Sequence, residues 1–443
     1  MTEGSAFSHI VTFAFPLFIG SALQELYVLA DAMIASHFIG ERGLAAIGSV
    51  SAISSMLLSF AIGVNHGFSL HISRAFGGEN MRELKRCTTV MVVLDVLLSL
   101  LLTLVALLAV RGLLVWLKTP NDIFHMAHMY IFVSICGLSA TVIYNMCAGY
   151  LRSLGNSRVP LYFLIVSSFL NILLDLLFIC VLGMGVEGAA LATVLSQLVS
   201  ATLSIIYIVR VYPDYLPGRE ELRVRLGVYL DMLATGISFG IMSSVYQVGT
   251  VILQRSINAL GTVVITSHTA SRKMFEATNI PSSTLGQATA VFTSQNYGAG
   301  RIDRVRKGFR ITFMLQLFWS LLCILFAYTF ARSFAALIAN TGDAVILGWS
   351  ERYFRTCVLF YPVVALVYIF RNSLQSLGRR IIPVLSSCIE LFGKLVSGLF
   401  IVPKVGYQAV ILTEPLTWTA MAIFLTVGYF ILLRRGAFTH THI

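Results

Sequence analysis

This sequence has few charged residues. Asp, Glu, Lys and Arg make up 12% of its 443 residues, against about 25% in an average soluble domain. Apolar side chains make up 57% of the chain, and the mean hydropathy is +0.84. Apolar runs of about 20 residues recur along the whole length, each long enough to cross ~30 Å of hydrocarbon as a helix. The composition therefore excludes an ordinary soluble protein and predicts an integral membrane protein.

The sequence also lacks the short motifs of enzymes and metalloproteins. It has no glycine-rich phosphate loop with a lysine, which argues against pumping driven by ATP, and no nucleophile elbow. Its seven cysteines are scattered, mostly within apolar segments, and their spacing fits neither a disulfide framework nor a metal site. We therefore expect a protein that is not an enzyme and has no cofactor.

Acidic residues are scarce, with 20 Asp and Glu against 31 Lys and Arg, so the net charge is +11. Placement argues against a nucleic-acid partner, because most basic residues lie in alternate short loops, as the positive-inside rule describes. These basic segments are 74–86, 152–158, 210–225, 301–310, 371–380 and the tail at Arg434 and Arg435. The pattern predicts a multi-pass protein of the plasma (inner) membrane with both termini in the cytoplasm.

The apolar segments and loops fit twelve membrane spans. The predicted spans are 8–38, 45–72, 87–112, 123–149, 158–182, 186–210, 227–257, 262–294, 308–335, 346–370, 380–402 and 408–433. A polar stretch at 212–226 divides them into an N-terminal lobe, 1–211, and a C-terminal lobe, 227–443. Pro16, Pro281 and Pro362 fall inside spans, where proline is expected to kink or break a helix.

The second half of the chain repeats features of the first. Leu151, Ser153, Leu154, Gly155 and Pro160 recur with the same spacing as Leu374, Ser376, Leu377, Gly378 and Pro383. Each half has an even number of spans, so both begin on the same side, and the repeat is parallel about an axis along the membrane normal. This pattern predicts an all-α membrane protein with twelve transmembrane helices in two pseudo-symmetric six-helix lobes, the usual geometry of a transporter.

Several polar side chains of the first lobe lie at one depth in the membrane. At ~1.5 Å per residue, they are roughly 12 Å below the outer boundary on four different spans: Asp31, Tyr130, Asp175 and Thr193. Asn171 is one turn from Asp175, and Gln24, Tyr27 and Asp31 share a helix face. This group could bind a proton, or Na⁺ through Asp31, Asn171 and Asp175. The alternative is a polar network that only holds helices together.

Other charged residues inside spans have simpler interpretations. Glu390 and Lys394 are spaced by four, which predicts a mutually neutralising pair. Arg272, Lys273 and Glu276 lie together in one span and are expected to neutralise one another as well. Glu414 occupies the second-lobe position of Thr193 and could be a second cation or substrate group. The sequence leaves the roles of Glu25, Asp95, Glu390 and Lys394 open.

Over essentially its whole length, the chain resembles the multidrug and toxic compound extrusion (MATE) family. The matching stretches are "FPLFIGSALQELYVLADAMIASHFIG", "LRSLGNSRVP", "NILLDLLFI", "GVEGAALATVLSQ" and "TSQNYGAGRIDRVRK". The resemblance implies a V-shaped twelve-helix antiporter that exports organic cations and hydrophobic drugs in exchange for H⁺ or Na⁺. In the DinF-like and related branches, the cation site lies in the N-terminal lobe. Its residues match Asp31, Tyr27, Tyr130, Asn171, Asp175 and Thr193.

The sequence departs from another branch, which uses acidic residues on spans 7 and 10. The corresponding stretches here, "GISFGIMSSVYQVGT" and "CVLFYPVVALVYIF", contain no carboxylate, and Gln247 stands about where the span 7 acid would be. Gln24, Gln247 and Glu414 remain candidates for substrate contact or a second-lobe site. We expect organic cations or drugs and membrane lipids as partners, and a monomer.

Two rival functions remain open. A lipid-linked oligosaccharide flippase of the same superfamily would be expected to line its cavity with several basic residues for pyrophosphate. Here few basic residues lie deep, chiefly Arg272, Lys273 and Lys394. A membrane scaffold or receptor that transports nothing would not need carboxylates at matched depth.

Overall fold

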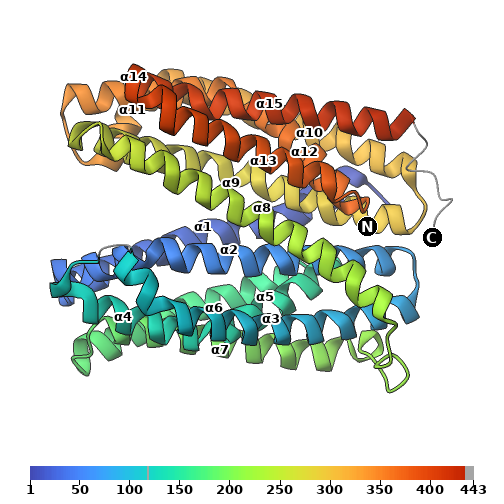
Figure 1. Cartoon of the computed structure of the whole chain (residues 1–443). Coiled ribbons are helices and arrows are strands. Elements are labelled where there is room, and N and C mark those ends of the chain that lie inside the picture. The colour runs from blue at the N-terminus through green and yellow to red at the C-terminus, as the bar shows by residue number, and fades with distance from the viewer. Residues whose placement is uncertain (117–118, 435–443) are drawn as a thin grey trace. The chain divides into compact units, whose positions relative to one another are not determined.

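The computed structural model describes residues 1–116 and 119–434, and all regular structure in these ranges is helical (Figure 1). Arg435 of the expected basic tail lies outside the described residues. The α-helices are α1 (Ala6–Phe38), α2 (Glu41–Gly77), α3 (Met81–Trp116), α4 (Asn121–Cys136), α5 (Leu138–Ser153), α6 (Arg158–Asp175), α7 (Val186–Val211), α8 (Leu226–Asn258), α9 (Thr262–Gly298), α10 (Ile302–Ala339), α11 (Ala344–Leu359), α12 (Tyr361–Ser376), α13 (Ile381–Val396), α14 (Val402–Val405) and α15 (Tyr407–Arg434). Three short helices complete the set: η1 (Leu176–Val181), η2 (Pro213–Tyr215) and η3 (Ser397–Ile401).

The predicted all-α membrane fold is confirmed. In the described residues, nine helices are long and apolar enough to cross a membrane, and eleven spans result if each of two bent helix pairs is one span. The predicted span that these candidates leave out is the eighth, 262–294, which coincides with the 37-residue helix α9. It is less apolar because it contains Arg272, Lys273 and Glu276 as well as many hydroxyl and amide side chains.

Two predicted spans are broken in the middle. The axes of α11 and α12 differ by 52° at Phe360, just before Pro362, as the proline predicted. The axes of α4 and α5 differ by 43° at Gly137, a break that the sequence analysis did not anticipate. A Cβ at Gly137 would lie 2.0 Å from Val194 Cγ2 of α7. At this break, the backbone between α4 and α5 therefore lies directly against α7. Pro16 and Pro281 lie inside helices that continue through them.

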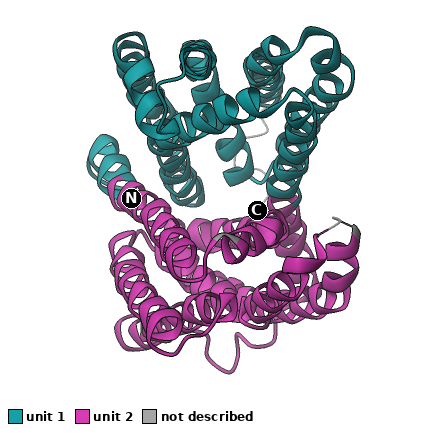
Figure 2. Ribbon diagram, turned by 90° about the vertical axis from the view of Figure 1, so that its left-hand side faces the viewer, with its two compact units in different colours: residues 1–14, 241–443 teal, residues 15–240 magenta. Residues whose placement is uncertain are grey.

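The described residues form two compact units (Figure 2). Unit 2 is Phe15–Gly240, and unit 1 combines Met1–Ala14 with the described residues from Ile241 onward. Both boundaries therefore fall inside helices, α1 and α8, whereas the sequence analysis divided the chain in the 212–226 connection. The lobes 1–211 and 227–443 stay a prediction about the membrane repeat, because compact units reflect packing and not span order.

Each unit has its own apolar core. In unit 2, Phe68, Ile72 and Leu84 are fully buried in a cluster drawn from α2, α3 and α5. In unit 1, Phe354 and Leu425 belong to a larger cluster that joins α8 through α12 with α15. Apolar side chains on the outer helix faces stay exposed in both units, as expected for surfaces that face lipid.

The internal repeat extends to individual hydrogen bonds. Gly155 and Gly378 have φ angles of 87° and 78°, a left-handed conformation that glycine adopts without steric cost. In the turn before each glycine, Ser153 Oγ donates to the carbonyl oxygen of Ser69 at 2.7 Å, and Ser376 Oγ donates to that of Ala290 at 2.9 Å. The π-helices η1 and η3 also stand at equivalent places, after α6 and α13. The two halves therefore share the same local backbone conformation at these turns and π-helices.

Candidate functional site

Two acidic side chains meet inside unit 2. Asp31 lies in α1, and Asp175 is the last residue of α6, immediately before the π-helix η1. Their carboxyl groups lie close enough to interact electrostatically. Asp175 is completely buried. Since π-turns inside helices are frequent at functional sites, the placement of Asp175 at such a turn distinguishes it from an ordinary packing residue.

α1 lies against α6 near Gly20. A Cβ on Gly20 of α1 would lie 3.4 Å from Leu164 Cδ2 of α6. The two helices therefore pack closely about three turns before Asp31.

Amide and hydroxyl groups extend the acid pair. Asn171, one turn before Asp175 on α6, donates from Nδ2 to Thr193 Oγ1 of α7 at 3.4 Å. Thr193 Oγ1 in turn donates to the carbonyl oxygen of Ala189 at 3.2 Å. Asn171 is 2% exposed, so its side chain is removed from bulk water. α6 and α7 thus contribute a carboxylate, an amide and a hydroxyl to one neighbourhood.

Two phenols complete the group. Tyr27 lies one turn before Asp31, within range of its charge, and Gln24 lies on the same helix. Tyr130 of α4 lies within electrostatic range of Asp31, Tyr27 and Asp175. The structure therefore brings together the six residues that the sequence analysis grouped by depth and resemblance, with Gln24 beside them.

Four buried oxygen atoms of the group have no hydrogen-bond donor among the described residues. Within the described residues, no N–H or O–H group reaches Asp31 Oδ1, Asn171 Oδ1 or either carboxylate oxygen of Asp175. Buried oxygen atoms without a partner are costly, and a proton or a cation would satisfy them. Carboxylate, amide and hydroxyl oxygens are hard donors of the kind that alkali and alkaline-earth cations bind. The donor set therefore fits H⁺ or Na⁺.

A site for a transition metal has less support. Within the described residues, no group of three or more His, Cys, Asp or Glu side chains could hold a metal ion. The acid pair has two such residues, and its other donors are amide, phenol and hydroxyl oxygens. That chemistry favours a weakly held monovalent cation over a tightly bound transition metal.

The other candidates lie elsewhere. Gln247, in α8, and Glu414, in α15, belong to unit 1. Glu25 is exposed on α1. Asp95, in α3, is 1% exposed, and neither of its carboxylate oxygens has a hydrogen-bond partner among the described residues. These four are therefore not established as members of the acid-pair group.

Unit 1 contains a network of charged residues. Lys394 Nζ donates to Glu390 Oε1 at 3.0 Å, which confirms the predicted pair. Glu276 lies 3.5 Å from Arg272 and 3.6 Å from Lys273, as their shared span predicted.

Arg371 was not predicted as part of this network, because the sequence assigned it to the basic loop 371–380. Arg371 lies within α12, and its guanidinium is 3.7 Å from Glu390. The only feature of the sequence that could have indicated this position is that Arg371 directly follows an apolar run.

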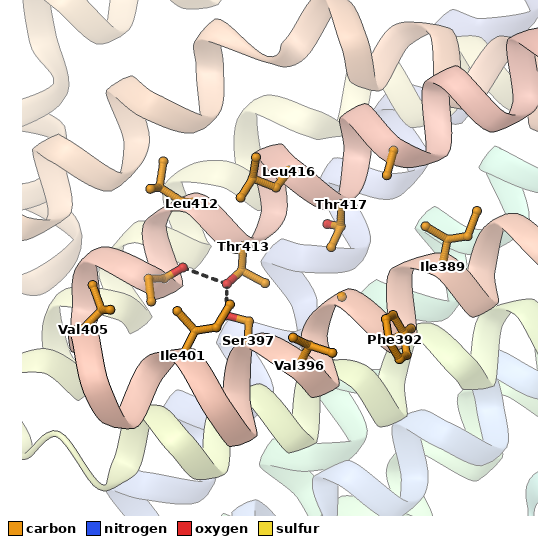
Figure 3. A pocket seen from close by; sticks show the side chains of 13 residues that line it. Ile389, Phe392, Val396, Ser397, Ile401, Val405, Leu412, Thr413, Leu416 and Thr417 are labelled. Carbon is orange, nitrogen blue, oxygen red and sulfur yellow. Dashed lines mark hydrogen bonds between the residues drawn. The ribbon is translucent and has the colours of Figure 1, made fainter.

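A separate groove of about 390 Å³ lies between α13, η3, α14 and α15 (Figure 3). Its lining is almost entirely apolar, and its main polar feature is a hydrogen bond between Ser397 and Thr413. This lining contains no charged or titratable group. The groove is therefore suited to apolar contact and not to ion coupling.

Comparisons with known proteins agree along nearly the whole chain. A family model described as MatE matches residues 16–177 and 239–397. A "Probable multidrug resistance protein YpnP" of Bacillus subtilis is 26% identical over 379 residues, covering 85% of this chain and 84% of that protein. YoeA of the same organism, also described as a probable multidrug resistance protein, is 23% identical over 441 residues, covering 97% and 94%.

Solved structures show the same fold. A crystal structure of MATE in the bent conformation superposes with a TM-score of 0.89 at 23% identity, covering 98% of this chain and 96% of the other. An outward-facing MATE transporter of the MOP superfamily gives a TM-score of 0.87 at 22% identity, with 98% and 97% coverage.

Proposed function

Because this chain belongs to the MATE family of multidrug efflux transporters, we propose that it is a secondary active antiporter. It exports organic cations and hydrophobic drugs in exchange for H⁺ or Na⁺, by alternating access. The chain is a multi-pass membrane protein and not an enzyme. Small drug-like molecules are its substrate class, as expected for the family.

The observation that supports ion coupling is the acid pair of unit 2. Asp31 and Asp175 face each other away from bulk water, with buried oxygen atoms that no described donor reaches. Two adjacent carboxylates repel one another unless a proton or a cation lies between them. We assign coupling to this pair, supported by Tyr27, Tyr130, Asn171 and Thr193. Asp31, Asn171 and Asp175 would be the ligands if the ion is Na⁺.

We therefore propose that the protein belongs to the branch with an N-terminal-lobe cation site, which includes the DinF-like proteins. The stretches of α8 and α12 that would supply a second-lobe acid contain no carboxylate over 236–250 and 357–370. Glu414 and Gln247 of unit 1 remain candidates for substrate contact, as does Gln24 in unit 2.

Coupling requires that binding of the ion weakens binding of the substrate, and the reverse. Ion binding between Asp31 and Asp175 changes the hydrogen bonds of α1, whose Pro16 and Gly20 allow it to bend. A difference of a few kcal/mol between the two binding events is enough to link the fluxes. In this scheme the ion enters from outside, and the substrate leaves as α1 rearranges.

The orientation of the chain in the membrane follows from the distribution of its basic residues. The basic segments, including Arg301, Arg304 and Arg306 after α9, should face the cytoplasm. Both termini then lie on the cytoplasmic side of the plasma membrane, and the two six-span lobes are joined on that same side. We expect the transporter to work as a monomer, since the acid pair is complete within one chain.

The test is efflux of a fluorescent organic cation from proteoliposomes under an imposed pH gradient or an imposed Na⁺ gradient. Wild type is compared with Asp31→Asn. The matched control is Asp231→Asn, which removes a carboxylate of the same unit from a half-exposed position on α8 beside His71. We expect one gradient to drive wild type and Asp231→Asn, and Asp31→Asn to be inactive in both.

Efflux by Asp31→Asn at the wild-type rate would refute coupling at the acid pair. If neither gradient moves the dye in any variant, cation antiport itself is wrong. The lipid-linked oligosaccharide flippase would then be the leading alternative.

A further inference from the structure

One further carboxyl group of unit 2 is buried without a counter-charge. Asp95 lies in α3 and is 1% exposed, and neither of its carboxylate oxygens has a hydrogen-bond partner among the described residues. By contrast, the buried acids Glu390 and Glu414 of unit 1 both contact Lys394. An isolated ionised carboxylate in such a place is far more costly than a neutral one. The charge of Asp95 must therefore be removed or compensated.

The surroundings of Asp95 follow from the packing of α2, α3 and α5. A Cβ on Gly149 of α5 would contact Ser69 Oγ of α2 and lie 3.6 Å from Met91 Cε of α3, so these three residues lie at one level. Four residues further along both helices, Ser73 Oγ of α2 donates to the carbonyl oxygen of Ser153 of α5 at 3.3 Å. α2 and α5 therefore run parallel here, whereas α3 runs back after the short connection 78–80.

One helical turn away from that level, each of the three helices carries a polar side chain. They are Asn65 of α2, Asp95 of α3 and Asn145 of α5, each four residues from the residue of its helix at the first level. The helix directions place all three on the same side of it. Cys147 of α5 lies within electrostatic range of Asp95, as this arrangement requires. Asp95 therefore lies at the same level as two amide side chains.

The amide donors at this level are already engaged. Asn65 Nδ2 donates to the carbonyl oxygen of Ala61 at 3.2 Å, and Asn145 Nδ2 donates to that of Thr141 at 2.8 Å. These bonds identify the nitrogen of each amide, so its oxygen is the atom left for other contacts. Asn65 Oδ1 is buried and has no donor among the described residues. Three acceptor atoms, two on Asp95 and one on Asn65, are therefore left without a hydrogen to accept.

Titratable and charged residues on the elements packed against α3 act on partners of their own. His66 of α2 and Arg152 of α5 lie within electrostatic range of each other, and α4 packs against the other end of α3, at 106–114. The remaining groups and their partners are Glu83, Arg74 and Asp231 with Cys87, His71 with Asp231, Tyr144 with Arg152, and Tyr150 with Tyr212 and Tyr215. Cys147 is thus the titratable neighbour of Asp95, and a thiol offers no positive charge.

We propose that Asp95 is a proton-binding site of unit 2, separate from the acid pair of α1 and α6. A proton removes the buried charge and turns one carboxyl oxygen into a donor, and Asn65 Oδ1 is the unpartnered acceptor at its level. A metal cation fits less well, because hard cations are held by about six oxygens and three unpartnered oxygens of the described residues lie here.

Proton release from Asp95 is tied to helix packing. An ionised Asp95 has no counter-charge in the present arrangement of the described residues, so loss of the proton requires α2, α3 and α5 to rearrange or to admit water. The site therefore links one proton to the packing of these three helices. It does not depend on the proposed cation antiport or on which ion the acid pair takes.

The test is infrared spectroscopy of the full-length protein in lipid nanodiscs at neutral pH. A protonated carboxyl group has a C=O stretching band that an ionised carboxylate lacks. Wild type is compared with Asp95→Asn and with the control Asp231→Asn, which removes a carboxylate with a 51% exposed side chain. We expect Asp95→Asn to lose one protonated-carboxyl band that Asp231→Asn keeps. The same band should persist in Asp31→Asn, which separates it from the acid pair.

Asn65→Leu tests the acceptor of the proton. Leucine is similar in size but accepts no hydrogen bond, so the Asp95 band should persist and shift in frequency because its O–H group loses a partner. Asn258→Leu, which removes an exposed amide of α8, should leave the band unchanged. Because Asn65→Leu retains the carboxyl group, it keeps the proposal testable if Asp95→Asn fails to fold.

Two results would count against the proposal. If the protonated-carboxyl bands are the same in wild type, Asp95→Asn and Asn65→Leu, Asp95 is ionised and holds no proton. If Asp95→Asn removes a band that Asn65→Leu leaves unshifted, Asp95 binds the proton but Asn65 is not its acceptor.

Discussion

Lys394 and Glu390 form a buried ion pair one helical turn apart on α13, with Nζ and Oε1 separated by 3.0 Å and no exposed surface on the lysine. Lys394 also lies 3.4 Å from Glu414 of α15. Its ammonium is therefore shared by two carboxylates from two helices, so the pair is part of tertiary packing as well as of one helix.

Replacing this lysine should be strongly destabilising. Lys394→Met retains the apolar stem but leaves Glu390 and Glu414 without their shared cation, which costs about 3–5 kcal/mol when a buried pair is broken from one side. Thermal unfolding of the purified protein in nanodiscs measures the effect. The double variant Lys394→Met with Glu390→Gln should recover part of the loss. An unfolding midpoint equal to that of wild type for Lys394→Met would contradict the electrostatic role.

A close contact at a glycine of unit 2 predicts that adding a methyl group there lowers the stability of the protein. A Cβ on Gly67 of α2 would lie 2.6 Å from Gly236 Cα of α8 and 2.9 Å from the carbonyl oxygen of Thr235. Since the obstacle is backbone, Gly67→Ala must push α2 and α8 apart, at a cost of about 1–3 kcal/mol. Its unfolding midpoint should fall below that of wild type.

Gly48, on the same helix, is the matched control. No atom lies within 4 Å of a Cβ added there, so Gly48→Ala should be neutral or stabilising by about 0.5–1 kcal/mol, because alanine is the better helix former. Equal effects at the two positions would mean that α2 and α8 do not approach each other as described.

A third prediction concerns Arg304, in the first turn of α10. Its guanidinium donates to the carbonyl oxygens of Met1, Glu3 and Gly4 at 2.9–3.1 Å and to Asn296 Oδ1 at 2.9 Å. Arg304→Ala should release this segment, and amide hydrogen exchange over residues 2–8 should become about tenfold faster, because several charge-assisted bonds are lost.

The exposed neighbour Lys307 serves as the control for Arg304. Lys307→Ala removes the same charge from the same helix and should leave the exchange rates unchanged. If both variants accelerate exchange equally, net charge and not the specific hydrogen bonds holds residues 1–4 in place.

Much of the fold could be predicted from the sequence because it depends on local composition. Apolar runs of span length and the loops between them placed the predicted spans close to the helix boundaries, as α7 at Val186–Val211 illustrates. The repeated turn at Gly155 and Gly378 was visible as a recurring sequence, and both glycines adopt the left-handed conformation. Proline likewise indicated the break before Pro362.

Other features could not be predicted because their cause lies in a different segment. At the break, the side chain of Val194 in α7 leaves no room for a Cβ at Gly137, and no local pattern records that contact. Arg371 was assigned to a loop because charge normally ends an apolar span, yet Glu390 of α13 allows it to stay within the fold. In both places a distant partner determines the local outcome.

The sequence by itself determined that this protein is helical, embedded in a membrane and internally repeated, because hydrophobicity and turn chemistry act over a few residues at a time. It also placed Asp31 and Asp175 at one depth, since depth follows from counting residues along a helix. Only the tertiary structure decided that the two carboxyl groups lie close together, and that charged residues of α12, α13 and α15 in unit 1 meet as ion pairs. Those outcomes depend on how each helix is rotated about its axis, and that rotation is fixed by packing against helices far away in the sequence.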